Sequence, residues 1–429
     1  MREDFLQFIW AQRLYRSAFM TSTDGDTVEV IEPGRLNPDA GPDFFNAKIH
    51  VHNVTWVGNV EVHLTSDDWY AHGHDSDPAY DNVVLHVVGR STGRKVLNSK
   101  GRPIPEVSLE YDPLLWQRFE GMVLHTDAIR CEDILHDLPT VIRRDWLDAL
   151  LVERMNEKCE RVRVLMREFS ADWDQVFFSL LARAMGGKVN ADAMELLARV
   201  TPLRILLKHN NPLQGEALLL GQAGMLHTDV SDDYLSLLRR EYSFLQQKFN
   251  LEPLNAAIWK YARLRPQGFP DVRIAQLAAI LRAWPGNFGD CMGLNLNSLL
   301  SAEASEYWNS HFRLGTPSDM LHPKALGPDA RRIVVVNCVV PFAMVMAERK
   351  ADDSARTLAL DVLRSLPKEE NTIIAGWRRR GIEADDEADI QALIYLRKRY
   401  CDNGDCLRCR FGRWAISRGF SPIPYAKLN

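Results

Sequence analysis

The first 115 residues carry short runs in which apolar and polar positions alternate, the pattern of half-buried β-strands. Before them, Phe5, Ile9 and Leu14 recur at helical spacing and predict a helix over residues 3–17. A turn at His52 and Asn53 separates two of the predicted strands, and residues 67–81 form a short helix or an ordered loop. Strands are predicted over residues 27–32, 44–51, 55–64, 82–89 and 105–111, with a hairpin-like stretch at 91–101.

Beyond about residue 115 the apolar positions change to a helical period. Prolines such as Pro202, Pro212 and Pro266 punctuate this part of the chain. Helices are predicted over residues 144–168, 173–185, 192–199, 232–249, 272–284 and 332–349. The pattern therefore predicts an α/β domain at residues 1–115, followed by a mostly α-helical domain at residues 116–429.

Composition agrees with a globular protein of two or three domains. The chain has 429 residues, of which 46% are hydrophobic and 25% are charged. The net charge of −5 provides no general attraction for nucleic acid, so a site for a polyanion has to be a local patch. The oligomeric state is left open by these numbers.

The ends of the chain and its cysteines indicate a cytoplasmic protein. The N-terminus carries Glu3 and Asp4 early and lacks the apolar run of a signal peptide. We find no run of eighteen apolar residues, so no membrane-spanning helix is expected. Seven irregularly spaced cysteines argue against a secreted disulfide framework and for a reducing compartment.

One predicted strand carries candidate chemistry on one face. Alternation over residues 57–64 places Asn59, Glu61 and His63 on the face opposite an apolar one. Asp43 stands where the neighbouring strand opens and supplies a second carboxylate. Such a group can form a metal site or an acid–base site. The alternative is that Asp43 serves a turn and Glu61 faces solvent.

The order Pro42-Asp43, a strand, then Glu61-Val62-His63 resembles the PD-(D/E)xK nuclease superfamily. The resemblance implies a restriction-endonuclease-like αβββαβ core in which Asp43 and Glu61 bind Mg²⁺ or Mn²⁺ and activate water. It also implies cleavage of phosphodiester bonds in DNA or RNA, with Glu3 as a further acidic group. His63 stands where the superfamily has lysine. A histidine can bind a metal or act as a base, but it is only partly charged at neutral pH.

The whole chain also resembles an uncharacterised bacterial family of unknown function. The segments that carry this resemblance are EDFLQFIW, AGPDFFNAKI, GNVEVH, SDDWYAHGH, YDNVVLHVV and a C-terminal cysteine cluster. It covers most of the chain and implies no activity.

A second group of candidate ligands follows the strand that carries Glu61. His72 and His74, with acids close by, resemble the ligands of Zn²⁺ or Mn²⁺ and raise the alternative of a zinc-dependent hydrolase. The competing interpretation is a hydrogen-bonded loop that caps the sheet. His86 lies among valines and leucine, and we interpret it as a satisfied core residue. The other polar members of the group are Asp68, Asp77, Tyr80 and Asp81.

The cysteines near the C-terminus form a third candidate site. Cys401, Cys406 and Cys409 are spaced as ligands of Zn²⁺ or of an iron–sulfur cluster, either of which normally takes a fourth ligand. The family resemblance implies Cys131 as that ligand. The alternative is three free thiols near a helix end. The remaining cysteines, which we expect in the core, are Cys159, Cys291 and Cys338.

Basic residues are frequent in the same C-terminal region, interleaved with aromatic ones. Arginines pair with phosphates and aromatic rings stack on bases, so nucleic acid is a candidate partner. Acids between them, such as Glu383 and Asp385, indicate equally well a solvated face with internal ion pairs. The candidate contacts are Arg378, Arg379, Arg380, Arg397, Lys398, Arg399 and Arg410.

Three functions stay open from the sequence. The first is a metal-dependent nuclease that uses Asp43, Glu61 and His63. The second is a non-catalytic module that binds nucleic acid or protein, on a nuclease fold that has lost its lysine. The third is the zinc-dependent hydrolase built on His72 and His74.

Overall fold

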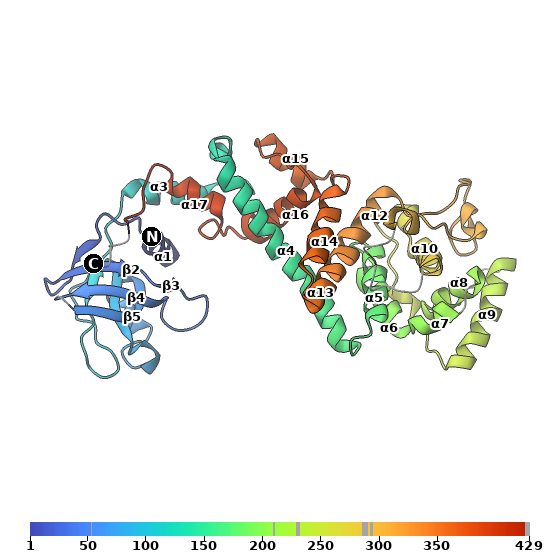
Figure 1. Ribbon diagram of the computed structural model, residues 1–429, viewed down its shortest axis with the longest axis horizontal. Coiled ribbons are helices and arrows are strands. Elements are labelled where there is room, and N and C mark those ends of the chain that lie inside the picture. The colour runs from blue at the N-terminus through green and yellow to red at the C-terminus, as the bar shows by residue number, and fades with distance from the viewer. Residues whose placement is uncertain (53, 209–210, 229–231, 285–290, 292–294, 425–429) are drawn as a thin grey trace. The chain divides into compact units, whose positions relative to one another are not determined.

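The chain folds into two units, each assembled from more than one stretch of sequence. A computed structural model describes residues 1–52, 54–208, 211–228, 232–284, 291 and 295–424 (Figure 1). The N-terminal unit comprises Met1–Trp146, Trp377–Ile382 and Tyr395–Asn429. The helical unit comprises Leu147–Gly376 and Glu383–Ile394. The division drawn from sequence near residue 115 stays a prediction.

The strands predicted from alternation are present in the N-terminal unit. Those expected over residues 27–32 and 44–51 match β2 and β4 at both ends, whereas Asn53 of the predicted turn lies outside the described residues. The first helix ends at Ala11 because Arg13 adopts a left-handed backbone, with φ of 55°. The elements are α1 (Glu3–Ala11), β1 (Phe19–Thr21), β2 (Thr27–Glu32), β3 (Arg35–Leu36), β4 (Phe44–Val51), β5 (Val54–Thr65), β6 (Val83–Arg90) and β7 (Glu106–Ser108).

These strands form one mixed sheet that nearly closes into a barrel. Its order is β1-β2-β4-β5-β6-β7, and Figure 1 shows β2, β4 and β5 side by side. Pairing is antiparallel as far as β5 and parallel from β5 to β7. A bridge between Ser22 and Val107 joins the two edges. The parallel step needs a crossover, which α2 (Asp68–Ala71) and the 3₁₀ turn η1 (Pro78–Tyr80) supply.

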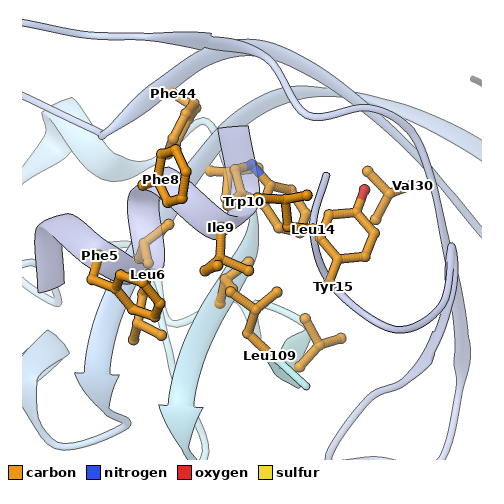
Figure 2. Close-up of a cluster of buried hydrophobic side chains, with 14 of the residues drawn as sticks. Phe5, Leu6, Phe8, Ile9, Trp10, Leu14, Tyr15, Val30, Phe44 and Leu109 are labelled. Carbon is orange, nitrogen blue, oxygen red and sulfur yellow. The ribbon is translucent and has the colours of Figure 1, made fainter. Parts of the chain in front are cut away.

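Helix α1 covers the apolar face of this sheet. Its Leu6 and Ile9 are fully buried in the same cluster as Val62 of β5 and Val87 of β6. Figure 2 shows the side chains of α1 lying among those of the strands. Burial of each such side chain contributes about 1.5–3 kcal/mol. Since neighbouring residues of a strand point to opposite faces, the residues between these valines lie on the other face of the sheet.

The C-terminal segment belongs to the N-terminal unit, which the periodicity did not predict. Ile416 of α17 (Arg410–Ser417) is buried in the core of the sheet. Arg118 of α3 (Pro113–Leu124) donates hydrogen bonds from Nη1 to the carbonyl oxygens of Ile416, at 2.9 Å, and Arg418, at 2.7 Å. Two further turns complete the unit, η2 (Glu132–Asp137) and the π-turn η8 (Arg397–Cys401).

The rest of the chain is mostly helical, as predicted. The helix expected over residues 173–185 matches α5 at both ends. The helix expected over residues 332–349 contains a π-turn, η7 (Val335–Val339), next to Pro341, which has no amide hydrogen to donate. The helices are α4 (Thr140–Glu168), α5 (Trp173–Met185), α6 (Ala191–Val200), α7 (Leu203–Lys208), α8 (Pro212–Gln222), α9 (Asp233–Phe249), α10 (Pro270–Ala283), α11 (Leu296–Leu299), α12 (Pro328–Val334), α13 (Val340–Lys350), α14 (Asp353–Ser365), α15 (Thr372–Arg379) and α16 (Glu387–Leu396).

One helical stretch is long and apolar enough to span a membrane by length and composition. This is Pro328–Lys350, the single such stretch among the residues that the structure describes. Its apolar window is 72% buried inside the protein, as in the core helix of a soluble fold. The cytoplasmic location stays a prediction.

Truncating a buried side chain of α1 tests the packing of this helix on the sheet. Leu6→Ala should lower the free energy of unfolding by about 2–5 kcal/mol, because it leaves a cavity between helix and strands. Leu124→Ala, on a side chain that is 74% exposed, should change the free energy by no more than about 0.5 kcal/mol. Denaturant unfolding followed by circular dichroism measures both. Equal effects would contradict the burial of α1.

Candidate metal centre

The polar face of the sheet gathers charged residues from three neighbouring strands. Glu61 of β5 lies opposite His86 of β6, and His86 lies opposite Glu106 of β7. All three side chains are buried, although each is polar or charged. Buried polar groups are stable only with hydrogen-bond partners or a bound ion, so this face of the sheet is a candidate functional site.

Three imidazoles converge over this face. His63 lies on β5, whereas His72 and His74 follow α2, and ligand nitrogens of the three lie within 4.8 Å of one another. His63 Nε2 is 3.2 Å from His72 Nδ1. His74 is buried, while His72 is exposed, so the cluster has a side open to solvent. Three nitrogens at this spacing can bind one transition-metal ion.

The end of α2 explains how His74 turns back toward the sheet. The amide of His74 donates to the carbonyl of Trp69 at 3.0 Å, across Gly73, whose φ is 75°. This is the hydrogen bond that closes many helices through a left-handed glycine. Trp69 is fully buried and donates from Nε1 to the carbonyl of Leu97 at 2.9 Å. The indole therefore anchors the segment that carries His72 and His74.

Two carboxylates adjoin the imidazoles. Glu61 Oε1 lies 3.4 Å from Nε2 of both His63 and His74. Its other oxygen, Oε2, accepts a hydrogen bond from the amide of Asp43 at 3.0 Å, and Asp43 Oδ2 accepts one from the amide of Val62 at 3.0 Å. The two carboxylates proposed from sequence are thus locked to each other's strands. Asp43, Glu61, His63, His72 and His74 form one cluster, which we call the imidazole–carboxylate cluster.

The acids of this cluster repel one another. Burial and the negative charge of Glu61 raise the pKa of Asp43 to about 7. Burial and Glu61 also raise the pKa of Glu3, the first residue of α1, which the sequence suggested as a further acid. A bound cation would remove this repulsion.

His63 is held in its neutral form. Burial, followed by the nearby charges of His86, His74 and His72, lowers the pKa of His63 to about 2. Neutral imidazole is the form that binds metals. A permanently neutral side chain cannot replace the charge of the lysine found in the PD-(D/E)xK pattern.

A hydrogen-bonded chain fixes the orientation of His63. His63 Nδ1 lies 2.9 Å from His86 Nε2, and His86 Nδ1 lies 3.0 Å from Glu106 Oε2. Glu106 Oε1 accepts hydrogen bonds from Ser66 Oγ at 2.8 Å and from Ser91 Oγ at 2.7 Å. With Glu106 ionised, the protons are assigned to both Nδ1 atoms, which leaves the lone pair of His63 Nε2 toward the cluster. Burial opposes ionisation of Glu106, but the hydrogen bonds from His86 and the serines lower its pKa below the usual value.

Glu106 was missed in the sequence, and the role of His86 was understated. His86 is a buried, hydrogen-bonded residue, as expected, and it also connects the cluster to Glu106. A glutamate placed among apolar residues just after Pro105 was the available signal. Strand pairing was needed to interpret it, because Glu106 is far from His63 in the sequence.

The remaining polar residues of this loop have structural partners. Tyr80 is buried and stacks on His74 with ring centroids 3.7 Å apart; burial, Glu61 and Asp43 raise its pKa to about 12. Three carboxylates accept hydrogen bonds from neighbouring residues: Asp68 from Thr65, Asp77 from Ala79, and Asp81 from Ser99.

A second group of potential ligands, His125, Glu132 and Asp133, is more open to solvent. Its Glu132 is already paired with Arg380. The group is therefore a weaker candidate for metal binding than the three imidazoles.

The structure places the predicted cysteines as follows. Cys131 lies near Cys409 and Cys406, whose charges add to the rise in its pKa that burial causes. Cys401 also lies near these cysteines, and the charges of Cys409, Cys131 and Cys406 add to the rise in its pKa. Cys159, Cys291 and Cys338 are buried, as expected from their apolar surroundings.

The basic residues of the C-terminal region divide into two groups. Arg397 is paired with Asp402 at 2.6 Å, and Arg380 and Arg410 are paired with Glu132 and Asp145. These arginines are engaged inside the N-terminal unit. The exposed members of the predicted set are Arg378, Arg379, Lys398 and Arg399.

Comparison with known proteins gives a family. A model described as "Protein of unknown function (DUF2851)" matches residues 3–372. The chain belongs to the DUF2851 family. The matched residues contain the whole imidazole–carboxylate cluster together with His86, Glu106 and Cys131, and they end before Cys401. No curated protein and no solved structure matches the chain.

The raised pKa of Asp43 predicts a stability difference in the metal-free protein. Folding raises this pKa to about 7 from 3.8, so the folded state binds an extra proton between about pH 4 and 7 and loses stability as the pH rises through that range. Asp43→Asn should therefore stabilise the metal-free protein at pH 8, by about 1–3 kcal/mol, and much less at pH 4. Asp77→Asn, on an exposed carboxylate, is the control. Denaturant unfolding at both pH values measures the effect, and a destabilised Asp43→Asn protein at pH 8 would contradict it.

The hydrogen-bonded chain predicts an effect of Glu106 on metal binding from a distance. Glu106→Gln removes the charged acceptor of His86 and should weaken binding of Zn²⁺ by about 10–100-fold, the usual effect of losing such a partner. Glu110→Gln, an exposed glutamate of the same segment, should leave the affinity unchanged. Competition with a metal indicator measures the affinity, and circular dichroism checks the fold. If the two variants bind Zn²⁺ with equal affinity, Glu106 has no part in metal binding.

Proposed function

We propose that the chain is a metal-dependent hydrolase whose metal is held by His63, His72 and His74, with Glu61 beside them. The observation that carries this proposal is the convergence of three imidazole nitrogens within 4.8 Å, next to a buried carboxylate. Nitrogen ligands favour Zn²⁺, with Mn²⁺ as the second candidate, over Mg²⁺, which prefers oxygen ligands. The magnesium site and the zinc site inferred separately from sequence thereby become one site.

The residues of the cluster take different roles in this proposal. A metal in this position lowers the pKa of a water molecule and polarises the bond that is attacked. His63 acts as a ligand and not as a base, because it is 1% exposed and its Nδ1 is bonded to His86. Asp43 is the proton acceptor, since its carboxylate adjoins Glu61 and a bound cation would keep it ionised.

We infer phosphodiesters as the substrate class. Asp43 at the start of β4 and Glu61 on the adjacent β5 follow the order of the PD-(D/E)xK pattern, and the amide of Asp43 bonds to Glu61. A restriction-endonuclease-like core is part of this proposal. The mixed sheet with a helix on one face and a crossover between parallel strands supports it. Exposed Arg378, Arg379 and Lys398 are candidates for contacts with a nucleic-acid backbone.

The absence of the superfamily lysine has a consequence within this proposal. The positive charge near the scissile phosphate has to come from the metal, because neutral His63 provides none. A His63→Lys variant should therefore lose activity, since it would bury an ammonium group next to the imidazoles. The superfamily pattern taken alone predicts the opposite.

An assay with defined metals tests the proposal. The protein is stripped of metal and reloaded with Zn²⁺, Mn²⁺ or Mg²⁺, then offered single-stranded and duplex DNA, RNA and an aryl phosphodiester. Cleavage should require Zn²⁺ or Mn²⁺ and fall by about 10²–10⁴-fold in His72→Ala, Glu61→Ala and Asp43→Ala. His52→Ala, on an exposed histidine that follows β4 at the end away from Asp43, should keep full activity.

The assay also decides between enzyme and binding module. If the wild type and Glu61→Ala are equally inert on every substrate while the folded protein binds nucleic acid, a non-catalytic module replaces the hydrolase. If the aryl phosphodiester is cut and nucleic acids are not, the hydrolase stands and its substrate class is smaller phosphodiesters.

A further inference from the structure

Four cysteines from two distant parts of the chain lie in the N-terminal unit. Cys131 precedes η2, Cys401 ends η8, Cys406 lies in the following turn, and Cys409 precedes α17. Burial and then the charges of Cys409 and Cys406 raise the pKa of Cys131, and Cys401 is affected by the other three. None of the four thiols is in a disulfide.

The chain around these thiols is folded tightly enough to hold them in place. The amide of Cys406 donates to Gly404 at 2.9 Å, and that of Cys409 donates to Asp405 at 3.2 Å. Gly404 has φ of 68°, and a Cβ there would lie 2.8 Å from the guanidinium of Arg130, next to Cys131. The turn is therefore packed against the residue that precedes the fourth cysteine.

Donors and cations surround the sulfur atoms. Burial raises the pKa of Cys409 to about 11, against the effect of amide hydrogen bonds from Gly412 and Phe411 to its sulfur. The indole of Trp146, which is 4% exposed, also donates toward the sulfur of Cys409 and lowers its pKa. Several donors directed at one buried sulfur would stabilise it as a metal-bound thiolate.

Arginines offset the charge that four thiolates would bring. Burial raises the pKa of Cys406, and the nearby charge of Arg130 opposes this rise. The charge of Arg397 likewise opposes the rise in the pKa of Cys401. A tetrathiolate centre that holds a divalent ion carries a net charge of about −2, which such cations stabilise.

We infer that Cys131, Cys401, Cys406 and Cys409 hold one thiolate-bound metal centre, either Zn²⁺ or an iron–sulfur cluster. Thiolates select these soft centres over Mg²⁺ and Ca²⁺. The centre is separate from the imidazole–carboxylate cluster and does not depend on the proposed hydrolase. Its role is structural: it joins the C-terminal segment to Cys131, in the same unit where Ile416 and Arg118 already attach that segment to the sheet.

Metal analysis of the full-length protein tests this inference. The His72→Ala, His74→Ala double variant, purified without oxygen, should retain about one centre per chain, seen as zinc or as iron with acid-labile sulfide and a brown colour. Adding Cys401→Ser or Cys406→Ser should reduce that content at least tenfold, whereas Cys159→Ser, on a buried cysteine outside the group, should not. Zinc and iron–sulfide are the two supporting outcomes.

A second measurement covers the case in which the serine variants do not fold. The double histidine variant is exchanged into Co²⁺, whose thiolate complexes absorb in the near ultraviolet, and its thiols are titrated with and without a chelator. Four thiols should become reactive together when the metal is removed, and the melting temperature should fall. A folded double variant that contains neither zinc nor iron, acquires no cobalt–thiolate absorbance and has freely reactive thiols would overturn the inference. Loss of hydrolase activity alone would leave it standing.

Discussion

The parallel pairing of β5 with β6 is the constraint on which the N-terminal unit depends. This register places Val62 beside Val87 on the face covered by α1, and Glu61 beside His86 on the opposite face. A shift of one residue would exchange the two faces and bury the acids against α1. The crossover that parallel strands require is also the segment that brings His72 and His74 over the sheet. The core and the candidate site are consequences of the same pairing.

The polar face is organised for a purpose other than stability. A buried carboxyl with a pKa of about 7 destabilises the metal-free fold at neutral pH, and a buried histidine with a pKa of about 2 destabilises it as the pH falls below about 6.5. Strained groups of this kind collect at functional sites. The hydrogen bonds from His63 to His86 and from His86 to Glu106 offset part of this cost, because every donor in the series has an acceptor. A rigid ligand with one free lone pair is the result.

The two candidate centres differ in how far apart their residues lie in the sequence. The imidazole–carboxylate cluster draws its ligands from β5 and the crossover after it, so it is nearly local in sequence. The cysteine group joins Cys131 to residues that follow the helical unit in the chain. The family match contains the first centre completely and the second only through Cys131. The proposed catalysis and the proposed metal-bound attachment of the C-terminal segment therefore lie at separate places in one unit.

The sequence by itself determined the strands over residues 27–32 and 44–51, the helix over 173–185 and the side of β5 on which Glu61 and His63 lie, because period and alternation are local properties. It also indicated His72 and His74 as candidate ligands, since their spacing is local. Only the tertiary structure decided that these side chains and Asp43 lie in one cluster and that Glu106 is hydrogen-bonded to it through His86. Strand pairing sets those contacts, and pairing partners leave no periodic trace in a single sequence. The same reason explains why the segment of α17 was assigned to the helical domain: the surface that it covers is encoded in residues far away along the chain.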